Sequence, residues 1–330
     1  MKEVKIACYG MSGHQILGHM PHLKRARLVA VSGIDRARFD DLKEKLPQAM
    51  GDAAFVESLD ALLADKGVDL ISFCSSRRDE QQHQVVAALK AGKHVLAEKP
   101  MALSLEQLAA LRQAAKLSGK QLRTMNPMIY DADFWGMKQV VDSGAIGEIV
   151  QVYAMKSYPY NDSRPQDEGV DGGMLMQAGI HAVSFIRFVT GLEFEEIFAQ
   201  DTQRGNPKPG ELRMAANVAC RLKGGALACI VVNYCNPKPI GFHGNDQLRV
   251  FGTKGMVELV DGRKRRMAVT VDKAPWHYPD GAPSHTYPQD LIDCILDGTP
   301  TLLTQEDSFI NTEVVLKARK SAATGQVVRM

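Results

Sequence analysis

The sequence predicts an α/β protein of two domains, with a parallel sheet in residues 1–125 and a mostly antiparallel sheet in an α+β domain over residues 126–330. Three observations support this prediction. The chain has 330 residues, whereas single domains usually hold roughly 100–200 residues. Before residue 125, short apolar runs alternate with amphipathic stretches, which is typical of a parallel sheet with right-handed crossovers. Longer β-type segments follow Asn126, as in a sheet of hairpins.

In the first domain we expect four strands, each followed by a helical stretch. The predicted strands are Val4–Tyr9, Leu28–Ser32, Val68–Cys74 and His94–Ala97. The predicted helical stretches run to about Leu23, over Ser58–Ala64 and Gln81–Ala91, and onward from Ser104. Gln107 stands three residues after Ser104, which is the spacing of a capping box and marks the start of the last helix.

The second domain is expected to combine hairpins with a few helices. The predicted strands are Ile149–Lys156, Arg213–Leu222, Ala226–Tyr234, Leu248–Phe251 and Met256–Val260. The predicted helices are Trp135–Val141, Leu175–Val189, Leu291–Leu296 and Glu306–Thr324. Glycine-containing turns at Lys223–Gly225 and Gly252–Gly255 join neighbouring strands into hairpins.

Composition excludes several classes of partner. The formal net charge is +2, so no strong basic field indicates nucleic acid or an anionic membrane surface. No apolar run reaches the ~18–20 residues of a membrane-spanning helix, and the first residues lack a signal-peptide pattern; a cytoplasmic location is therefore expected. The six cysteines are scattered without metal-ligand spacing, which favours reduced thiols and no metal site.

A glycine-containing turn follows the first predicted strand. It consists of Gly10, Met11, Ser12, Gly13, His14 and Gln15. Such a turn lets the backbone approach a dinucleotide pyrophosphate, and the next helix supplies free N–H groups and a partial positive charge. Ser12 and Gln15 stand where the fingerprint has its second and third glycines. The pattern predicts a dinucleotide site, with a plain tight turn as the alternative.

Charged residues follow the second predicted strand, where an acidic side chain usually holds the adenosine ribose. Asp35 lies 25 residues after Gly10, close to the usual spacing of about 20. Gly33 directly follows the strand, so Asp35 could lie too far out. Arg36 and Arg38 could instead meet a 2′-phosphate, or all three charges could be solvated. We expect NAD or NADP as the cofactor, with Asp35 and Arg36 near its adenosine end.

Two longer motifs carry a family resemblance. The run Ala87–Pro100, which ends in Glu98-Lys99-Pro100, resembles the Glu-Lys-Pro segment of the glucose–fructose oxidoreductase, inositol dehydrogenase and rhizopine-catabolism (Gfo/Idh/MocA) family. Gly172–His181 is similar to that family's GG-x-L-x-D/N-x-G-x-H stretch. Weaker matches follow the family's order at Ser143–Ile149, Phe251–Gly255 and Ala318–Val327.

This resemblance implies a fold and a chemistry. The fold is an N-terminal Rossmann domain followed by a domain whose large open sheet often forms the oligomer interface, so a homodimer or homotetramer is expected. The chemistry is NAD- or NADP-dependent oxidation or reduction of a sugar, a polyol or a related hydroxylated compound. In the family, the lysine of Glu-Lys-Pro lies by the nicotinamide and the substrate, and the histidine of the second motif acts as acid/base. These roles carry over to Lys99 and His181.

The sequence departs from the family pattern at two further places. Family members often have Thr-Pro-x-x-x-His after the third strand, whereas this chain has Ser76–Gln81 and lacks both the proline and the histidine. Gln177 stands where dehydrogenases frequently have aspartate. Because its side chain is an amide and does not ionise, it cannot serve as a second base as that aspartate might. We nevertheless expect Ser75, Ser76 and Glu98 at the cofactor. Glu98 is expected to be a buried carboxylate that orients the turn, and an ion-pair partner is the alternative.

Oxidising an alcohol requires a base for the hydroxyl proton and an acceptor for the hydride. The unperturbed pKa of histidine, near ~6.5, suits His181 as that base, and a packed core histidine is the alternative. Lys99 could stabilise negative charge on the substrate oxygen, and a solvated turn lysine is the alternative. Gln177, Tyr158 and Arg164 are candidates for binding the substrate, unless they belong to an ordinary polar segment.

Three functions are compatible with these features. The main hypothesis is an NAD(P)-dependent dehydrogenase or reductase acting on CH–OH groups. The alternatives are a glycoside-cleaving enzyme that keeps its NAD bound, and a non-catalytic sensor of sugars or dinucleotides. The altered Gly10–Gln15 and Ser76–Gln81 segments favour the sensor, whereas Lys99 and His181 favour an enzyme. Net turnover of the cofactor would separate the two enzyme classes.

Overall fold

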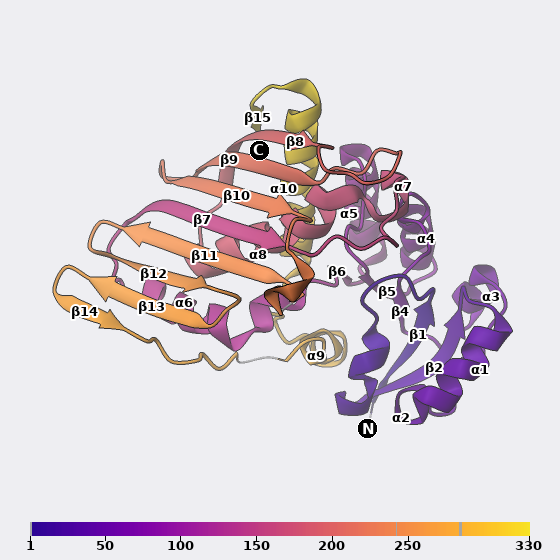
Figure 1. The fold of residues 1–330 in the computed structure, drawn as a ribbon. Helices are drawn as coiled ribbons and strands as arrows, with labels where there is room; N and C mark the ends of the chain where they lie inside the picture. The colour runs from indigo at the N-terminus through magenta and orange to yellow at the C-terminus, as the bar shows by residue number, and fades with distance from the viewer. Residues whose placement is uncertain (1, 242, 284–285) are drawn as a thin grey trace. The chain divides into compact units, whose positions relative to one another are not determined.

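A computed structural model describes residues 2–241, 243–283 and 286–330 of the chain. The chain forms two compact units (Figure 1). The first unit contains Met1–Pro127 and His285–Ile310, and the second contains Met128–Ser284 and Asn311–Met330. The sequence had placed every residue after 125 in one C-terminal domain. The structure differs because a late segment returns to complete the core of the first unit.

The first unit is built on a six-stranded parallel sheet with the order β3-β2-β1-β4-β5-β6. Its strands are β1 (Val4–Tyr9), β2 (Ala26–Ser32), β3 (Ala54–Phe55), β4 (Leu70–Phe73), β5 (His94–Ala97) and β6 (Leu122–Thr124). From β1 the chain adds β2 and β3 on one side of the sheet, and it then adds β4, β5 and β6 on the other side. The order of strands therefore reverses between β1 and β4, although all strands run parallel. Ligands bind at the carboxyl ends of the strands beside such a reversal. The predicted Rossmann arrangement is therefore confirmed.

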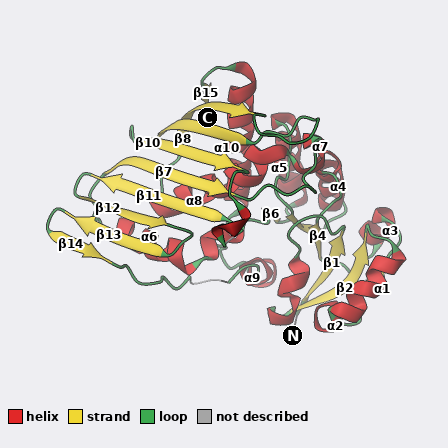
Figure 2. Cartoon of the chain, viewed as in Figure 1, coloured by secondary structure: helices red, strands yellow, loops and turns green. Residues whose placement is uncertain are grey.

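Helices connect the strands of this sheet (Figure 2). They are α1 (Arg36–Lys45), α2 (Pro47–Met50), α3 (Leu59–Ala64), α4 (Arg78–Lys90) and α5 (Leu105–Ser118), with α9 (Gln289–Asp297) added late in the sequence. The predicted cap of α5 is present, since Ser104 Oγ accepts a hydrogen bond from Gln107 N at 3.1 Å. The Gln107 side chain returns to Leu103 N at 2.7 Å, one residue before the expected position.

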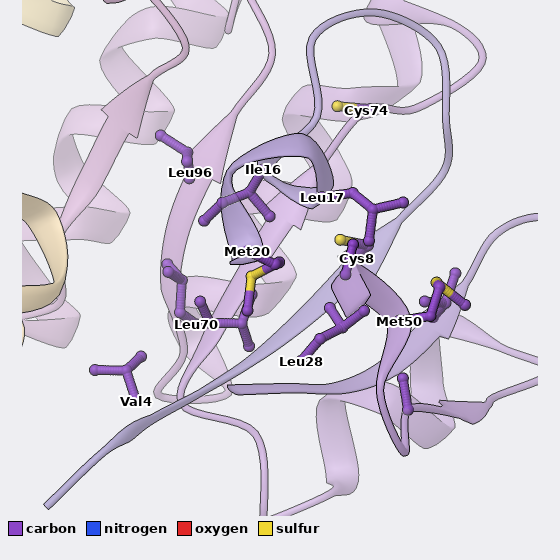
Figure 3. Close-up of a cluster of buried hydrophobic side chains, with 14 of the residues drawn as sticks. Val4, Cys8, Ile16, Leu17, Met20, Leu28, Met50, Leu70, Cys74 and Leu96 are labelled. Carbon is purple, nitrogen blue, oxygen red and sulfur yellow. The ribbon is translucent and has the colours of Figure 1, made fainter. Parts of the chain in front are cut away.

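A cluster of buried apolar side chains forms a core of this unit (Figure 3). Leu291 and Ile292 of α9 belong to the same cluster. The guanidinium of Arg25 also holds α9, through Asp293 at 2.6 Å and Asp297 at 2.5 Å. Burial of a leucine or isoleucine side chain contributes about 1.5–3 kcal/mol. The late segment is thus part of the Rossmann core.

The helical stretch after β1 is confirmed in extent but differs in type. It is η1 (Ile16–His22), a 3-10 helix. Pro21 lies within it and cannot donate a backbone hydrogen bond, which disfavours a regular α-helix. Ile16 and Leu17 anchor it in the core (Figure 3). The turn before it therefore leads into a short 3-10 helix and not into the long α-helix of a typical dinucleotide site.

The second unit is built on a nine-stranded sheet with the order β14-β13-β12-β11-β7-β10-β9-β8-β15. Its strands are β7 (Ile149–Ser157), β8 (Phe194–Thr202), β9 (Ala215–Leu222), β10 (Leu227–Asn233), β11 (Asn245–Gly252), β12 (Gly255–Val260), β13 (Arg265–Thr270), β14 (Lys273–Trp276) and β15 (Val328–Arg329). Neighbours pair antiparallel apart from β7 and β10, which are parallel. The predicted mostly antiparallel sheet is confirmed.

The helices of the second unit lie against one face of this sheet (Figure 1). Those that pack on it are α6 (Ala132–Asp142), the π-helix η3 (Leu175–Gly179) and α8 (Ile180–Thr190). The short α7 (Glu168–Asp171) precedes η3 in the chain, and α10 (Gln305–Thr324) is shared between the units. Phe134 of α6 stacks on Phe185 of α8 with ring centroids 4.8 Å apart. In the described part of the chain, no helix is both long and apolar enough to cross a bilayer.

The other face of the sheet carries partly exposed apolar side chains. Along β10, Ile230 and its even-numbered neighbours are buried, whereas Cys229 and Val231 are only half-buried. Leu227, at the start of the strand, is 48% exposed. This alternation shows one covered face and one accessible face in this unit.

Candidate active site

The carboxyl edge of the first unit's sheet brings together most of the residues predicted to bind a cofactor. Gly10 directly follows β1, with φ at +71°, and a Cβ there would lie 2.4 Å from the carbonyl oxygen of Cys74. Ser12 N donates to that same carbonyl at 2.9 Å. The turn after β1 therefore lies directly against the end of β4, and only glycine fits at position 10.

Glu98 lies beneath this turn. Its side chain is buried, and a Cβ on Gly13 would come within 2.8 Å of its carboxyl group. Its Oε1 lies 3.1 Å from Nδ1 of His14 and 3.8 Å from Nζ of Lys99. The turn residues Gly13 and His14 are thus joined in space to the Glu-Lys-Pro segment that follows β5.

Lys99 itself is 4% exposed. The alternative of a fully solvated turn lysine is therefore incorrect. A buried ammonium requires polar partners, and Glu98 is one of them. Its position after β5 is at the edge where ligands bind in this fold class.

Arg78 is a site residue that sequence reasoning missed. Its guanidinium is buried at the start of α4, with the residue 3% exposed. Nη1 donates to Ser75 O and Nη2 to Ser12 O, both at 2.5 Å, and Nε lies 3.4 Å from Lys99 O. One side chain therefore links the loops that follow β1, β4 and β5. We call Arg78 and these three carbonyl groups the arginine clamp.

Gln81 occupies the position of the expected family histidine. Its Nε2 donates to Glu98 O at 2.7 Å, and its Oε1 lies 3.4 Å from Ser75 N. It therefore ties the loop after β4 to the loop after β5. The departure noted in Ser76–Gln81 was the signal that this segment is unusual, although the sequence did not show how it is used.

The two serines of this loop are placed differently from each other. Ser75 is buried and its hydroxyl lies 2.5 Å from Gln84 Oε1, so it contacts the protein itself. Ser76 is exposed. Among the predicted pair, only Ser76 presents its side chain to solvent.

Burial also fixes protonation states at this edge. Desolvation, with the charge of Glu98 as a second cause, raises the pKa of the Cys74 thiol well above its ordinary value. The same two causes raise the pKa of the Tyr287 hydroxyl. Both groups are therefore neutral near pH 7, and the Cys74 thiol donates to His14 O at 3.0 Å.

The predicted ribose-binding region lies after β2. Asp35 is the N-cap of α1 and its Oδ1 accepts a hydrogen bond from Arg38 N at 2.7 Å. Arg36 is the first residue of α1 and pairs with Asp40 at 3.2 Å. These charges belong to a helix start and are exposed, which agrees with the alternative of solvated charges; their place at a cofactor stays a prediction.

In the second unit, Gln177 and His181 lie on consecutive turns of one helical segment. Gln177 is in η3, and His181 follows in the first turn of α8; they are 7% and 3% exposed. The Nε2 of Gln177 donates to Asp171 O. π-Helical turns are often found at functional sites, and this one contains Gln177 and directly precedes the turn of His181.

Aromatic and charged side chains gather beside Asp171. Arg164 lies 3.6 Å from the Asp171 carboxylate, and its guanidinium is 4.3 Å from the Tyr234 ring centroid. Tyr158 lies 6.4 Å from Tyr234, ring to ring. The predicted substrate-binding residues Tyr158, Arg164 and Gln177 are therefore grouped in this unit around a residue pair, Asp171 and Tyr234, that the sequence did not single out.

A buried ion pair adjoins this group. Lys156, in β7, pairs with Asp246 of β11, and both are about 95% buried (5% and 4% exposed). The Lys156 ammonium lies 5.1 Å from the Tyr158 ring centroid. Sequence reasoning missed this pair because Lys156 falls in a regular strand pattern.

No group of three or more His, Cys, Asp or Glu side chains suited to a metal ion occurs among the described residues. Lys99 lies in the first unit and His181 in the second.

Both units match protein families that are already known. Residues 3–125 match the model described as "Oxidoreductase family, NAD-binding Rossmann fold", and residues 134–258 match the Gfo/Idh/MocA C-terminal domain. Myo-inositol 2-dehydrogenase of Thermotoga maritima is 29% identical over 263 residues, which cover 76% of this chain and 74% of that protein. The NAD⁺-dependent scyllo-inositol 2-dehydrogenase of Bacillus subtilis is 23% identical, covering 92% and 89% of the two chains.

A solved structure agrees in fold. The aldose-aldose oxidoreductase of Caulobacter crescentus, complexed with glycerol, superimposes with a TM-score of 0.84 at 22% identity over the whole of both chains. The two family models follow each other in this chain in the order that the sequence motifs predicted. The chain therefore belongs to the Gfo/Idh/MocA family of NAD(P)-dependent oxidoreductases.

Proposed function

We propose that this protein is a dehydrogenase or reductase that interconverts a CH–OH group and a carbonyl group on a sugar, an inositol-like polyol or a close derivative. The observation that carries the proposal is the convergence, at one sheet edge, of the Gly10–Gln15 turn with Glu98 and Lys99. The relatives named as inositol dehydrogenases support the substrate class.

The residues at this edge fit a dinucleotide. Gly10 is buried and Gly13 is exposed, and a side chain at either position would collide with Cys74 O or Glu98; the turn is therefore free of side chains at both points, as a turn that approaches a pyrophosphate requires. Met11, Ser12, His14 and Gln15 complete the turn, and Ser76 is exposed beside it. When bound, the nicotinamide supplies the hydride acceptor or donor.

We assign Lys99 to the substrate oxygen. Its burial beside Glu98 keeps the ammonium desolvated and oriented, so it can stabilise negative charge that develops on that oxygen. Glu98 then acts as a positioning residue, because its second neighbour, His14, belongs to the Gly10–Gln15 turn, here called the cofactor turn.

We assign His181 to the proton. In oxidation, the imidazole would take the hydroxyl proton, the hydride on the carbon that bears this hydroxyl would go to the nicotinamide acceptor, and the C=O bond would form; reduction would reverse these transfers. Gln177 cannot exchange a proton, so it serves only as a hydrogen-bonding group. Tyr158 and Arg164, which lie near Asp171 and Tyr234, are the proposed contacts for further substrate hydroxyls.

The test is turnover of a sugar and inositol panel by Lys99→Met and His181→Ala variants, followed through the absorbance of the reduced cofactor. Loss of a positioned charge should lower turnover by roughly 100- to 1,000-fold, and loss of the acid/base by about 100- to 10,000-fold. Cofactor affinity should change far less. Lys90→Met and His83→Ala, at exposed positions of α4, are the matched controls.

Near-normal turnover in both site variants would show that the family roles do not apply to this chain. Binding of dinucleotide without any turnover on the whole panel would favour a sensor. Substrate cleavage without net formation of reduced or oxidised cofactor would instead identify the glycoside-cleaving class.

A further inference from the structure

The loop after β2 sets the choice between NAD and NADP in Rossmann folds. An acidic side chain there hydrogen-bonds the ribose hydroxyls of NAD, whereas an arginine accommodates the 2′-phosphate of NADP. We propose that this protein selects NADP(H), with Arg36 as the residue that binds the 2′-phosphate. The inference rests on the proposed cofactor site at the Gly10–Gln15 turn.

The first position after β2 cannot carry a carboxylate. It is Gly33, with φ at +72°. A Cβ there would lie 2.8 Å from Gly10 N and 3.0 Å from the ring of Tyr9. Because backbone and a packed ring surround this point, no acidic side chain fits at the end of the strand, next to the cofactor turn.

Asp35, the next acidic residue, is committed to α1. Its backbone is extended, at φ −77° and ψ 164°, and Oδ1 accepts a hydrogen bond from Arg38 N at 2.7 Å. This is the geometry of an N-cap. Its carboxylate is therefore aimed at the first turn of the helix, where it accepts from the backbone N–H of Arg38, and it is not presented as a ribose ligand.

Arg36 presents a cation at the same place. Its guanidinium lies 5.5 Å from the ring centroid of Phe55 and 5.7 Å from that of Phe39, so the two rings support the side chain. It is 69% exposed, and its bond partner Asp40 is 60% exposed. Such a solvated ion pair is weak, so a phosphate dianion can replace Asp40 and engage the fork of the guanidinium.

Other charges nearby do not offer the same combination. Asp35 and Asp40 are the acids closest in sequence, and both have the helix roles described above. Arg38, the other arginine expected here, pairs with Asp41 at 2.7 Å, and the contacts with the Phe39 and Phe55 rings belong to Arg36. Lys43 lies 5.7 Å from the Phe39 ring centroid, but it sits in the last turn of α1, two turns away from the end of β2. Arg36 is thus the cation that combines nearness to Gly33 with a supported, exposed head group.

The experiment compares dissociation constants for NADPH and NADH by nucleotide fluorescence, for the full-length wild type, Arg36→Leu and Lys43→Leu. The wild type should bind NADPH at least roughly 10-fold more tightly. Arg36→Leu should weaken NADPH binding by roughly 10- to 100-fold, as expected for losing a charged hydrogen bond, and should bring the two constants close together. Lys43→Leu should preserve the wild-type ratio.

Tighter binding of NADH by the wild type would overturn the inference while leaving the proposed cofactor site intact. An equal loss for both nucleotides in Arg36→Leu would overturn the assignment to Arg36, because a 2′-phosphate contact affects NADPH alone. Failure of the wild type to bind either nucleotide would overturn the proposed function itself, and with it this inference.

Discussion

His94, the first residue of β5, shows how burial of one side chain makes stability depend on pH. Desolvation lowers the pKa of its imidazole from 6.5 to about 4, and its Nδ1 accepts a hydrogen bond from Gln121 N at 3.0 Å. The folded chain therefore favours the neutral ring. Between about pH 6.5 and 4 the unfolded chain binds a proton that the folded chain does not, so stability is lost as the pH falls through this window.

We predict that His94→Asn flattens this dependence, because the asparagine oxygen can keep the bond to Gln121 N without titrating. The wild type should lose up to about 3 kcal/mol between pH 7 and pH 4 through this residue. Urea unfolding at several pH values measures the slope, with His83→Asn, at an exposed position of α4, as control. Parallel curves for wild type and His94→Asn would contradict the prediction.

At the scale of elements, the arginine clamp joins the loops after three strands. Replacing Arg78 leaves the carbonyls of Ser12, Ser75 and Lys99 without its donors, and buried polar groups without partners are costly. We predict that Arg78→Met lowers the free energy of unfolding by roughly 2–4 kcal/mol. It should also weaken dinucleotide binding, because the cofactor turn loses its support.

The neighbouring residue gives a matched control for this prediction. Arg77 pairs with Asp79 at 2.7 Å near the surface, with the two side chains 37% and 39% exposed, and exposed pairs contribute about 0–1 kcal/mol. Urea unfolding and nucleotide titration of Arg77→Met should give values near those of the wild type. If Arg78→Met behaved like Arg77→Met, the clamp would not stabilise the site.

The same scale shows which elements the sequence could predict. The strands β1 and β5 begin and end where expected, because each is a short, mostly apolar run bounded by turn residues. The strand β8 was missed: a bulge between Phe194 and Glu196 interrupts its alternation, so its apolar residues do not follow a period of two. Helix α1 was missed since only Phe39 and Leu42 among its ten residues are buried.

The site was predictable where local chemistry decides it and not where tertiary packing does. Gly10 and Gly13 could be singled out because a tight turn after a strand favours glycine, and a Cβ at either would collide with Cys74 O or Glu98. Arg78 was not, since an arginine that opens a polar helix usually remains solvated, and its burial depends on loops far away in the sequence. The π-helix that contains Gln177 likewise leaves no signal in the apolar pattern.

For the whole molecule, the accessible face of the nine-stranded sheet leads to a prediction of assembly. Leu227, Cys229 and Val231 lie along one strand of that face and are exposed or half-buried. Stable interfaces cover about 800 Å² on each partner, and an apolar sheet face favours association. Light scattering at micromolar concentration should therefore give a dimer or tetramer of the 36.2 kDa chain.

Leu227→Glu should weaken this assembly by placing a charge in the interface. Leu117 in α5 is 79% exposed. Leu117→Glu introduces the same charge in the other unit and should leave the mass of the assembly unchanged. A wild-type protein that remains at the mass of one chain would refute the prediction.

The return of α9 to the Rossmann unit has a consequence for how the protein is made. Leu291 and Ile292 fill part of a core whose other buried members lie before residue 126. Arg25 forms its ion pairs with Asp293 and Asp297, which are also synthesised late. A ribosome moving at about 5–20 residues per second releases the second unit's sheet, apart from its edge strand β15, before it supplies those side chains. The cofactor-binding half is thus begun first and finished late, so that gene fragments cut at residue 125 would encode an incomplete fold.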